Sequence, residues 1–371
     1  MKIEIQQLKL QYGKFTALHE FDLQIQDGES IVLLGQSGCG KTSAMRCVAG
    51  LERPTSGRII IGDDTVFDGA AGVNTPPNKR NVGMVFQSYA IWPHMTVFEN
   101  VAYSLATRKI AKEDIRKQVT AALTTVGLQA FAERGASLLS GGQMQRVALA
   151  RSLVMQPGAL LLDEPLSNLD ARLRDRLRVE LRELQLRLGL TCIYVTHDQS
   201  EAFALADRIA IMQGGRIVQI DTPQNIYANP ITSQIADFLG VSNVFPCSVT
   251  RVDPGRHVAE LSGHALAVHS SLPVPATTGA MSLCVRPESF RIQAADPRAP
   301  AAGDAANRWP GKVVVASFQG GYVQYAIQLD QGPEISAAQL TSEGPVLNSG
   351  DSVSVSLDPG AAQILPSELP A

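Results

Sequence analysis

Cysteine is scarce in this sequence. The 371 residues include five cysteines, an odd number, and no two of them stand at C-x-x-C spacing. A disulfide scaffold and a structural zinc site are therefore not expected, and free thiols suit a reducing compartment.

Long hydrophobic runs are also absent. The longest stretch without a charged residue, 261–285, contains two histidines and several Pro, Gly, Ser and Thr residues, so its composition does not fit a membrane-spanning helix. The opening MKIEIQQLKL alternates apolar and polar side chains as a strand does, and it lacks the apolar core of a signal peptide. We expect a chain without an export leader that works in the cytosol or on a membrane-spanning partner.

No single sign of charge dominates. The formal net charge is −3, hydrophobic residues make up 45% and charged residues 18%. The excess of basic residues that would indicate a nucleic-acid partner is missing, and the apolar content supports a large core rather than disorder. The length is enough for two domains.

Residues 1–239 alternate short apolar runs with helical patterns, which predicts an α/β domain. Four of the runs have the pattern of fully buried parallel strands. They lie at 30–35, 82–86, 159–163 and 191–196. Residues 88–156 are mostly helical in pattern, which predicts a helical subdomain inserted into the core. Residues 240–371 carry short alternating runs separated by Pro and Gly, which predicts a small all-β domain.

The stretch GQSGCGKT, residues 35–42, follows the first buried run and precedes a helical pattern. It fits the G-x-x-x-x-G-K-[ST] loop, in which backbone N–H groups and a helix N-terminus surround phosphate. Lys41 is expected to neutralise the β- and γ-phosphates of a nucleotide, and the Thr42 hydroxyl to bind Mg²⁺. An unrelated glycine-rich turn would not explain the flanking strand and helix.

Polar residues follow the other predicted strands. Asp163 ends ALLLD and Glu164 comes next, at the sheet edge where nucleotides bind in such folds. Asp163 is expected to hold Mg²⁺ through water, and Glu164 to polarise the attacking water of a hydrolytic NTPase. Gln87 and His197 follow two further strands. Contact with the metal, the water or the γ-phosphate is one interpretation of these two, and an exposed loop glutamine and a structural histidine are the others.

A second helix start suited to an anion lies at LSGGQ, residues 139–143. Ser140 is a good N-cap, and Gly141 and Gly142 allow close approach to a ligand where helix propensity disfavours glycine. An ordinary capped helix explains Ser140 but not the two glycines.

These motifs, in this order and with the turn SNLD at 167–170, resemble those of the ATP-binding subunits of ABC transporters. The resemblance implies a P-loop NTPase core with a mostly parallel sheet and an inserted helical subdomain. It also implies ATP hydrolysis with Mg²⁺ in a head-to-tail homodimer, where ATP lies between the P-loop of one copy and the LSGGQ of the other.

The resemblance assigns roles to single residues. Gln87 matches a glutamine that senses Mg²⁺ and water, and His197 matches the switch histidine. Tyr12 matches the aromatic residue that stacks on adenine, although a strand-end core tyrosine is the alternative. Asn168 is a departure, because small residues such as Ala are common at this position.

The resemblance also implies the full set of site residues. The nucleotide-binding residues are Tyr12, Gly35, Gln36, Ser37, Gly38, Cys39, Gly40, Lys41, Thr42 and Ser43. The residues that act in trans are Leu139, Ser140, Gly141, Gly142, Gln143 and Asp170. The Mg²⁺ ligands are Thr42, Gln87 and Asp163, and the catalytic residues are Glu164, His197 and Gln87.

GVSNVFPCSV and VRPESF, in the C-terminal domain, are similar to the transport-associated OB-like barrel of importer ATPases. This implies two transmembrane permease subunits, an extracytoplasmic solute-binding protein, and a position on the cytoplasmic face of the inner membrane. Ferric iron or a polyamine is the expected solute, with a sugar or another small solute as the alternative. No nucleic-acid partner is expected.

Two functions of other classes stay open. A non-transport ABC ATPase that acts on nucleic acid or ribosomes usually carries a coiled-coil insertion, paired zinc-type cysteines or two cassettes, and this sequence has none of these. A nucleotide-binding switch without turnover would not need Glu164 and His197.

Overall fold

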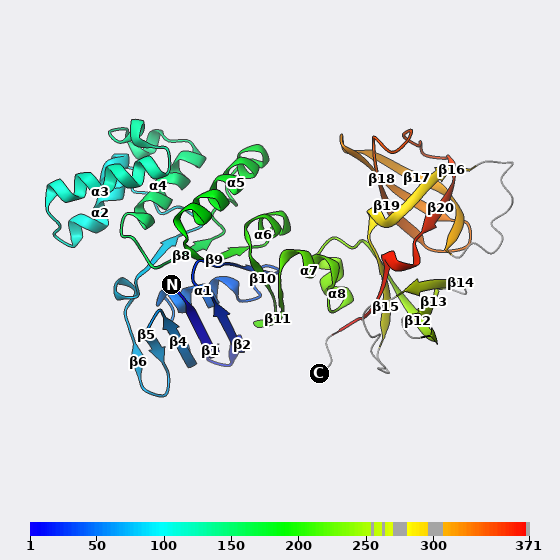
Figure 1. Ribbon diagram of the computed structural model, residues 1–371, viewed down its shortest axis with the longest axis horizontal. Coiled ribbons are helices and arrows are strands. Elements are labelled where there is room, and N and C mark those ends of the chain that lie inside the picture. The colour runs from blue at the N-terminus through cyan, green and yellow to red at the C-terminus, as the bar shows by residue number, and fades with distance from the viewer. Residues whose placement is uncertain (254–255, 262–263, 270–279, 296–306, 369–371) are drawn as a thin grey trace. The chain divides into compact units, whose positions relative to one another are not determined.

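The chain forms two compact units, Met1–Ile226 and Tyr227–Ala371. The first is α/β and the second is built from strands (Figure 1). The computed structural model describes residues 1–253, 256–261, 264–269, 280–295 and 307–368.

A six-stranded sheet forms the centre of the first unit. Its strands are β3 (Ser30–Leu34), β7 (Val82–Val85), β8 (Ala159–Asp163), β9 (Thr191–Thr196), β10 (Arg208–Gln213) and β11 (Arg216–Asp221). They lie in the order β11-β10-β3-β9-β8-β7, and every pair except β10-β11 is parallel. Every side chain of β3, β8 and β9 is buried, which explains their continuous apolar sequences.

A second, antiparallel sheet completes the first unit, and the sequence analysis does not separate it from the first. Its strands are β1 (Ile3–Tyr12), β2 (Phe15–Ile25), β4 (Ser56–Ile61), β5 (Asp64–Asp68) and β6 (Val73–Asn74), in the order β2-β1-β4-β5-β6. The helix α1 (Lys41–Ala49) packs between the two sheets. Met45 and Val48 of this helix share one apolar core with Ile5 of β1 and Ile193 of β9.

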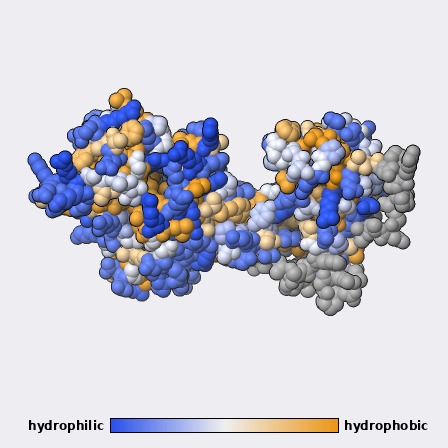
Figure 2. All heavy atoms as spheres, turned by 45° about the horizontal axis from the view of Figure 1, so that its top comes forward, coloured by the Kyte–Doolittle hydropathy of each residue, from blue (hydrophilic) through white to orange (hydrophobic). Residues whose placement is uncertain are grey.

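The helices of the first unit occupy two places. The inserted helices α2 (Val97–Thr107), α3 (Lys112–Thr125) and α4 (Gly141–Leu153) group together, and α5 (Ala171–Leu188), α6 (Gln199–Leu205) and α7 (Pro223–Ala228) follow later strands (Figure 1). Thr96 and Glu99 form a capping box at the start of α2, because each accepts the backbone N–H of the other. The face of the first unit seen in Figure 2 mixes hydrophilic and hydrophobic residues.

The second unit is a barrel-like pair of antiparallel sheets. One sheet has the order β14-β13-β12-β15-β21 and the other β16-β20-β17-β18-β19. The strands are β12 (Asn243–Asp253), β13 (Arg256–Leu261), β14 (His264–His269), β15 (Met281–Val285), β16 (Phe290–Ala294), β17 (Arg308–Phe318), β18 (Tyr322–Leu329), β19 (Glu334–Leu340), β20 (Ser352–Leu357) and β21 (Ala362–Pro366). Asn243 ties the sheets together, since its side chain bonds Val285 on β15 and Ser336 on β19.

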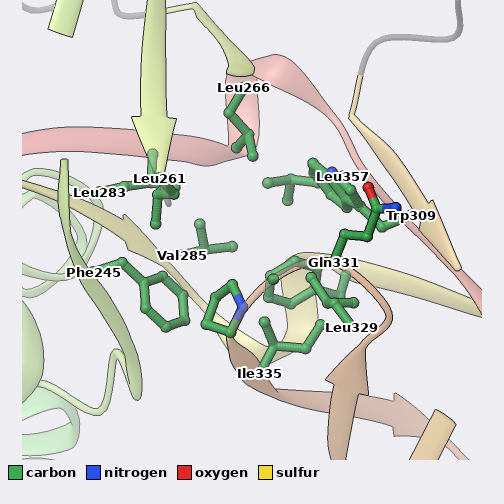
Figure 3. A pocket seen from close by; sticks show the side chains of 13 residues that line it. Phe245, Leu261, Leu266, Leu283, Val285, Trp309, Leu329, Gln331, Ile335 and Leu357 are labelled. Atoms are coloured by element: carbon green, nitrogen blue, oxygen red, sulfur yellow. The ribbon is translucent and has the colours of Figure 1, made fainter. Parts of the chain in front are cut away.

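A small cavity of about 40 Å³ lies in the core of this barrel (Figure 3). Its wall is almost entirely apolar, with Phe245, Leu266 and Trp309 among the lining side chains and Gln331 as its polar side chain. A charged nucleotide does not fit such a cavity. Phosphate chemistry is therefore not expected in this cavity.

The boundary between the units differs from the one expected at residues 239/240. The helix α8 (Ser233–Phe238) belongs to the second unit, because Ala236 packs in one apolar cluster with Cys284 of β15 and Leu365 of β21. This packing is invisible in the local sequence pattern. Among the residues that the structure describes, no helix combines the length and apolar character that a membrane-spanning segment requires.

Candidate functional site

The loop between β3 and α1 is shaped by glycines. Gly38 and Gly40 have φ values of +82° and +103°, in the left-handed region that favours glycine. A Cβ atom at Gly35 would lie 2.3 Å from the Met212 carbonyl oxygen, and one at Gly40 would lie 2.7 Å from a methyl carbon of Leu18. The loop therefore packs with its backbone against its neighbours, as a phosphate-binding loop must.

The Lys41 side chain lies inside this loop and is only 5% exposed. Its ammonium donates hydrogen bonds to the carbonyl oxygens of Gly35 at 2.8 Å and Gln36 at 2.9 Å. Both partners are uncharged, so the positive charge remains available to an anion bound in the loop. The residues present fit the phosphates of a nucleotide.

Thr42 and Asp163 form the second part of the site. The Thr42 hydroxyl donates a 3.0 Å hydrogen bond to Asp163 Oδ1. Burial raises the pKa of the Asp163 carboxyl, while the Thr42 bond and the charge of Arg46 act in the opposite direction. A hydroxyl beside a carboxylate is an oxygen donor set that suits Mg²⁺. The described residues contain no cluster of three or more His, Cys, Asp or Glu side chains arranged for a metal. The third predicted Mg²⁺ ligand, Gln87, stays a prediction.

Gln87, Glu164 and His197 meet at the ends of three adjacent strands. They follow β7, β8 and β9, which are neighbours in the parallel sheet. Glu164 Oε1 lies 3.1 Å from His197 Nδ1, and Glu164 Oε2 accepts a 3.0 Å hydrogen bond from Gln87 Nε2. The structure thus brings together three residues that the sequence could place only at separate strand ends.

The backbone of Glu164 is strained. Its φ is +43°, which is uncommon for a residue with a side chain, and its N–H donates to the Val195 carbonyl at 3.0 Å. Strain of this kind persists where surrounding contacts hold it, and it is concentrated at functional sites. The turn aims the carboxylate along the ends of β7 and β9.

Two side chains at the site were not assigned a role from the sequence. Arg174 donates to the Leu169 carbonyl at 3.0 Å and to the Asp198 carboxylate at 3.4 Å. Asn168 donates to the Gln87 carbonyl at 2.8 Å. Arg174 stands in a charge-rich helix, where it looks like any solvated arginine, so the local pattern contains no signal for its contact. For the Asn168 contact the sequence does contain a signal, because asparagine stands where Ala is common in the family.

The start of α4 lies apart from the P-loop of the same chain. The Ser140 N–H donates to Gln143 Oε1 at 2.9 Å, which caps the helix as expected for this sequence. A Cβ atom at Gly142 would lie 3.1 Å from a methyl carbon of Leu173. Packing against α5 is therefore a second reason for glycine there, besides close approach to a ligand. Figure 1 shows α4 among the inserted helices, apart from α1 of the same chain.

Tyr12 lies at the tip of the β1–β2 hairpin and is 49% exposed. Its hydroxyl donates to Glu52, and it stands directly opposite the exposed Phe15 in the strand pairing. It is therefore not a core tyrosine, and stacking on adenine stays a prediction. The hairpin approaches the P-loop where Leu18 faces Gly40.

The other predicted residues lie where their motifs place them. Asp170 caps α5 by accepting the Leu173 N–H at 3.0 Å. Gln36 and Ser37 are exposed, Cys39 is buried, Ser43 is part of α1, and Leu139 is buried just before α4.

Comparison with known proteins identifies both units. Residues 18–167 match the family described as ABC transporter, and residues 283–365 match the TOBE domain. The Fe(3+) ions import ATP-binding protein of Rhizobium etli is 46% identical over 331 residues, which cover 89% of this chain and 88% of that protein. The spermidine/putrescine import ATP-binding protein of Legionella pneumophila is 40% identical over 341 residues, 92% of this chain and 91% of that protein.

Solved structures match the first unit. CbiO1 from Clostridium perfringens, part of the ABC transporter complex cbiONQ, is 28% identical with a TM-score of 0.56, covering 65% of this chain and 94% of that chain. The dimeric structure of MJ0796, a bacterial ABC transporter cassette, is 29% identical with a TM-score of 0.52, covering 60% and 98%.

Proposed function

The chain belongs to the ATP-binding subunits of ABC transporters, and from that premise we propose that it hydrolyses ATP to drive import of a solute through separate membrane subunits. The observation that carries the proposal is the 3.0 Å contact of Thr42 with Asp163, with Glu164 as the next residue. It joins a phosphate-binding loop, a metal-binding oxygen pair and a carboxylate in one place.

The P-loop residues bind the phosphates. Backbone N–H groups at the start of α1 and the Lys41 ammonium attract negative charge that builds up during phosphoryl transfer. Thr42 and Asp163 would hold Mg²⁺, which when bound supplies further positive charge to the phosphate oxygens. Tyr12 is proposed to orient the nucleotide by stacking on its base.

Glu164 is proposed as the general base. The oxygen of a water molecule bonds to the terminal phosphorus of ATP, and the bond from that phosphorus to the bridging oxygen breaks. ADP leaves with the electron pair of that bond, and Glu164 accepts the proton of the water. His197 Nδ1 and Gln87 Nε2 each contact one oxygen of the Glu164 carboxylate.

A second copy of the chain is proposed to complete each site. The helix start at Ser140, Gly141 and Gly142 would contact the nucleotide held by the P-loop of the other copy. Two facts support this: α4 lies apart from α1 within one chain (Figure 1), and a dimeric cassette is among the similar solved structures. The loop containing Asp170 would cross the same interface.

Ferric iron or a polyamine is the proposed solute. The relatives named above are described as importing Fe(3+) ions or spermidine and putrescine. Two permease subunits, a solute-binding protein and a position on the cytoplasmic face of the membrane follow from an importer of this type. The second unit, which matches the TOBE domain, is proposed to serve regulation or to stabilise the dimer.

The hydrolytic assignment is tested with Glu164→Gln. The variant should bind ATP as the parent does, lose turnover by about 10²- to 10⁴-fold, and accumulate as an ATP-bound dimer in size-exclusion chromatography. Glu113→Gln, at an exposed position on α3, is the matched control and should leave the rate unchanged. Normal turnover in Glu164→Gln would show that Glu164 is not the base.

The solute is tested in the assembled complex. The chain is co-expressed with permease subunits from neighbouring genes, placed in liposomes, and assayed for ATPase with solute-binding protein loaded with Fe³⁺ or with spermidine. Stimulation by one loaded form identifies the solute class. Failure to associate with any permease would contradict the importer function itself.

A further inference from the structure

We propose that Asn168 is a positioning residue that holds the Gln87 amide against Glu164. The carboxylate of the general base then stays hydrogen-bonded to Gln87 until the 167–170 loop moves. The proposal rests on Glu164 being the general base. It concerns a residue to which neither the P-loop chemistry nor the signature helix assigns a role. Its evidence is a chain of three contacts in one copy of the protein.

The first contact fixes the backbone of Gln87. Asn168 Nδ2 donates to the Gln87 carbonyl oxygen at 2.8 Å. An alanine at residue 168 would have no donor to offer. The bond joins the segment after β7 to the turn after β8, which are otherwise separate loops.

The second contact joins the Gln87 side chain to the proposed base, Glu164. Gln87 Nε2 donates to Glu164 Oε2 at 3.0 Å and approaches the Ser167 hydroxyl at 3.5 Å. Ser167 in turn donates to the Glu164 carbonyl at 2.9 Å. The Gln87 amide is thus held between Glu164 and Ser167.

The arrangement limits what Glu164 can do. With His197 on Oε1 and Gln87 on Oε2, each carboxylate oxygen already has a protein partner. An ionised carboxylate has about four lone-pair sites, two on each oxygen, and a general base directs one of them at the attacking water. The Gln87 amide competes with water for the sites on Oε2, so release of this amide favours catalysis.

The third contact connects the loop to the signature helix. Leu169 is 7% exposed, and a Cβ atom at Gly141 would lie 3.1 Å from one of its methyl carbons. Displacement of the start of α4 would therefore push on Leu169 and move its neighbour Asn168. Asn168 links movement of the signature helix to release of Glu164.

The bond is suited to a reversible role. Asn168 and Gln87 are both exposed, so water can replace either partner when the loop moves. Loss of an exposed hydrogen bond changes an equilibrium by about two- to tenfold. The fold does not depend on the bond, because Leu166, Leu169 and Leu177 hold the loop in a separate apolar cluster.

The test compares three variants of the full-length chain at one protein concentration. Asn168→Ala removes the donor, Asn168→Asp keeps the shape but faces the carbonyl with an acceptor, and Asn225→Ala removes a comparable exposed amide that bonds Asp221 at 3.0 Å. Both Asn168 variants should raise the basal kcat for ATP about two- to tenfold, with KM and Tm unchanged. Asn225→Ala should match the parent.

Two outcomes overturn the proposal: a kcat that stays at the parent value or falls in both Asn168 variants, or a rise that comes with an equal change in KM. The single variants Asn168→Ala and Glu164→Gln, assayed side by side, separate this inference from the proposed function. If Glu164→Gln is inactive and Asn168→Ala is unchanged, only the role of Asn168 fails. If Glu164→Gln remains active, the assignment of the base fails first.

Discussion

The Thr42 hydroxyl donates a hydrogen bond to the Asp163 carboxylate across 121 positions of the sequence. The bond forms because Thr42, the last residue of the P-loop, lies in the first turn of α1 while Asp163 ends β8, and both face the same edge of the parallel sheet. Two of the proposed metal ligands are therefore in direct contact. This geometry allows the metal requirement to be tested separately from nucleotide binding.

Thr42→Val is expected to weaken the use of Mg²⁺. Valine keeps the shape of threonine but has no hydroxyl, so Asp163 loses its partner and the metal a ligand. The Mg²⁺ concentration for half-maximal ATPase should rise by roughly 10- to 100-fold, as measured by a metal titration at saturating ATP. Thr42→Ser retains the hydroxyl and should behave like the parent. Equal titrations for Val and Ser would contradict the ligand assignment.

Arg80→Ala is expected to destabilise the first unit strongly. Arg80 is 1% exposed, and its guanidinium donates to the carbonyls of Cys47 at 2.7 Å, Val48 at 3.1 Å and Thr75 at 2.7 Å. Its removal leaves buried acceptors at the end of α1 unpaired, so the free energy of unfolding should fall by about 3–5 kcal/mol in urea titrations. As a control, Arg58→Ala at an exposed position should change the free energy of unfolding by less than about 0.5 kcal/mol. An equally small loss in Arg80→Ala would contradict the role of Arg80 in capping the carbonyls at the end of α1.

Three thiols are expected to be unreactive in the folded protein. Burial raises the pKa of Cys47, Cys192 and Cys284 to about 12 each. At pH 8 only about one thiol in 10⁴ would be the reactive thiolate. Labelling with a maleimide followed by peptide mass mapping should find these residues unmodified in native protein and modified in guanidinium. Rapid native labelling of any of the three would show that its surroundings open in solution.

Glu201→Gln is expected to stabilise the protein more at high pH than at low pH. Glu201 is 3% exposed and accepts the hydroxyls of Thr196 at 2.7 Å and Tyr194 at 3.2 Å. Burial raises its pKa in the folded state, and the two hydroxyls oppose this shift only in part. The stability linked to this proton is present below the pKa of the unfolded chain and is lost as pH rises through the folded pKa.

Glutamine keeps an acceptor oxygen at this position without the charge. The Tm of Glu201→Gln should therefore exceed that of the parent at pH 8, and the difference should shrink toward pH 4. A thermal melt series across this range measures it. A difference that grows on acidification would mean that the pKa of Glu201 is shifted downward instead.

The parts of the site that come from one continuous stretch can be proposed from the sequence. The P-loop is built from residues 35–42 alone, so its glycines, Lys41 and Thr42 could be assigned from their spacing. The strand ends were also predicted, since a short, fully apolar run marks each buried parallel strand. Their meeting point was not predictable in the same way. Gln87, Glu164 and His197 come together because β7, β8 and β9 are neighbours, and strand order is a tertiary property.

The sequence alone determined the chemistry that is local: a glycine loop that can turn around phosphate, a lysine and a threonine behind it, and carboxylates at a strand end. Backbone conformation and nearest-neighbour spacing are enough for these. The tertiary structure alone decided which distant groups touch. It joined Asn168 to Gln87, buried Arg80 on the end of α1, and assigned α8 to the barrel through Ala236. Such contacts depend on how whole elements pack, and the pattern of one element does not encode the partner that it meets.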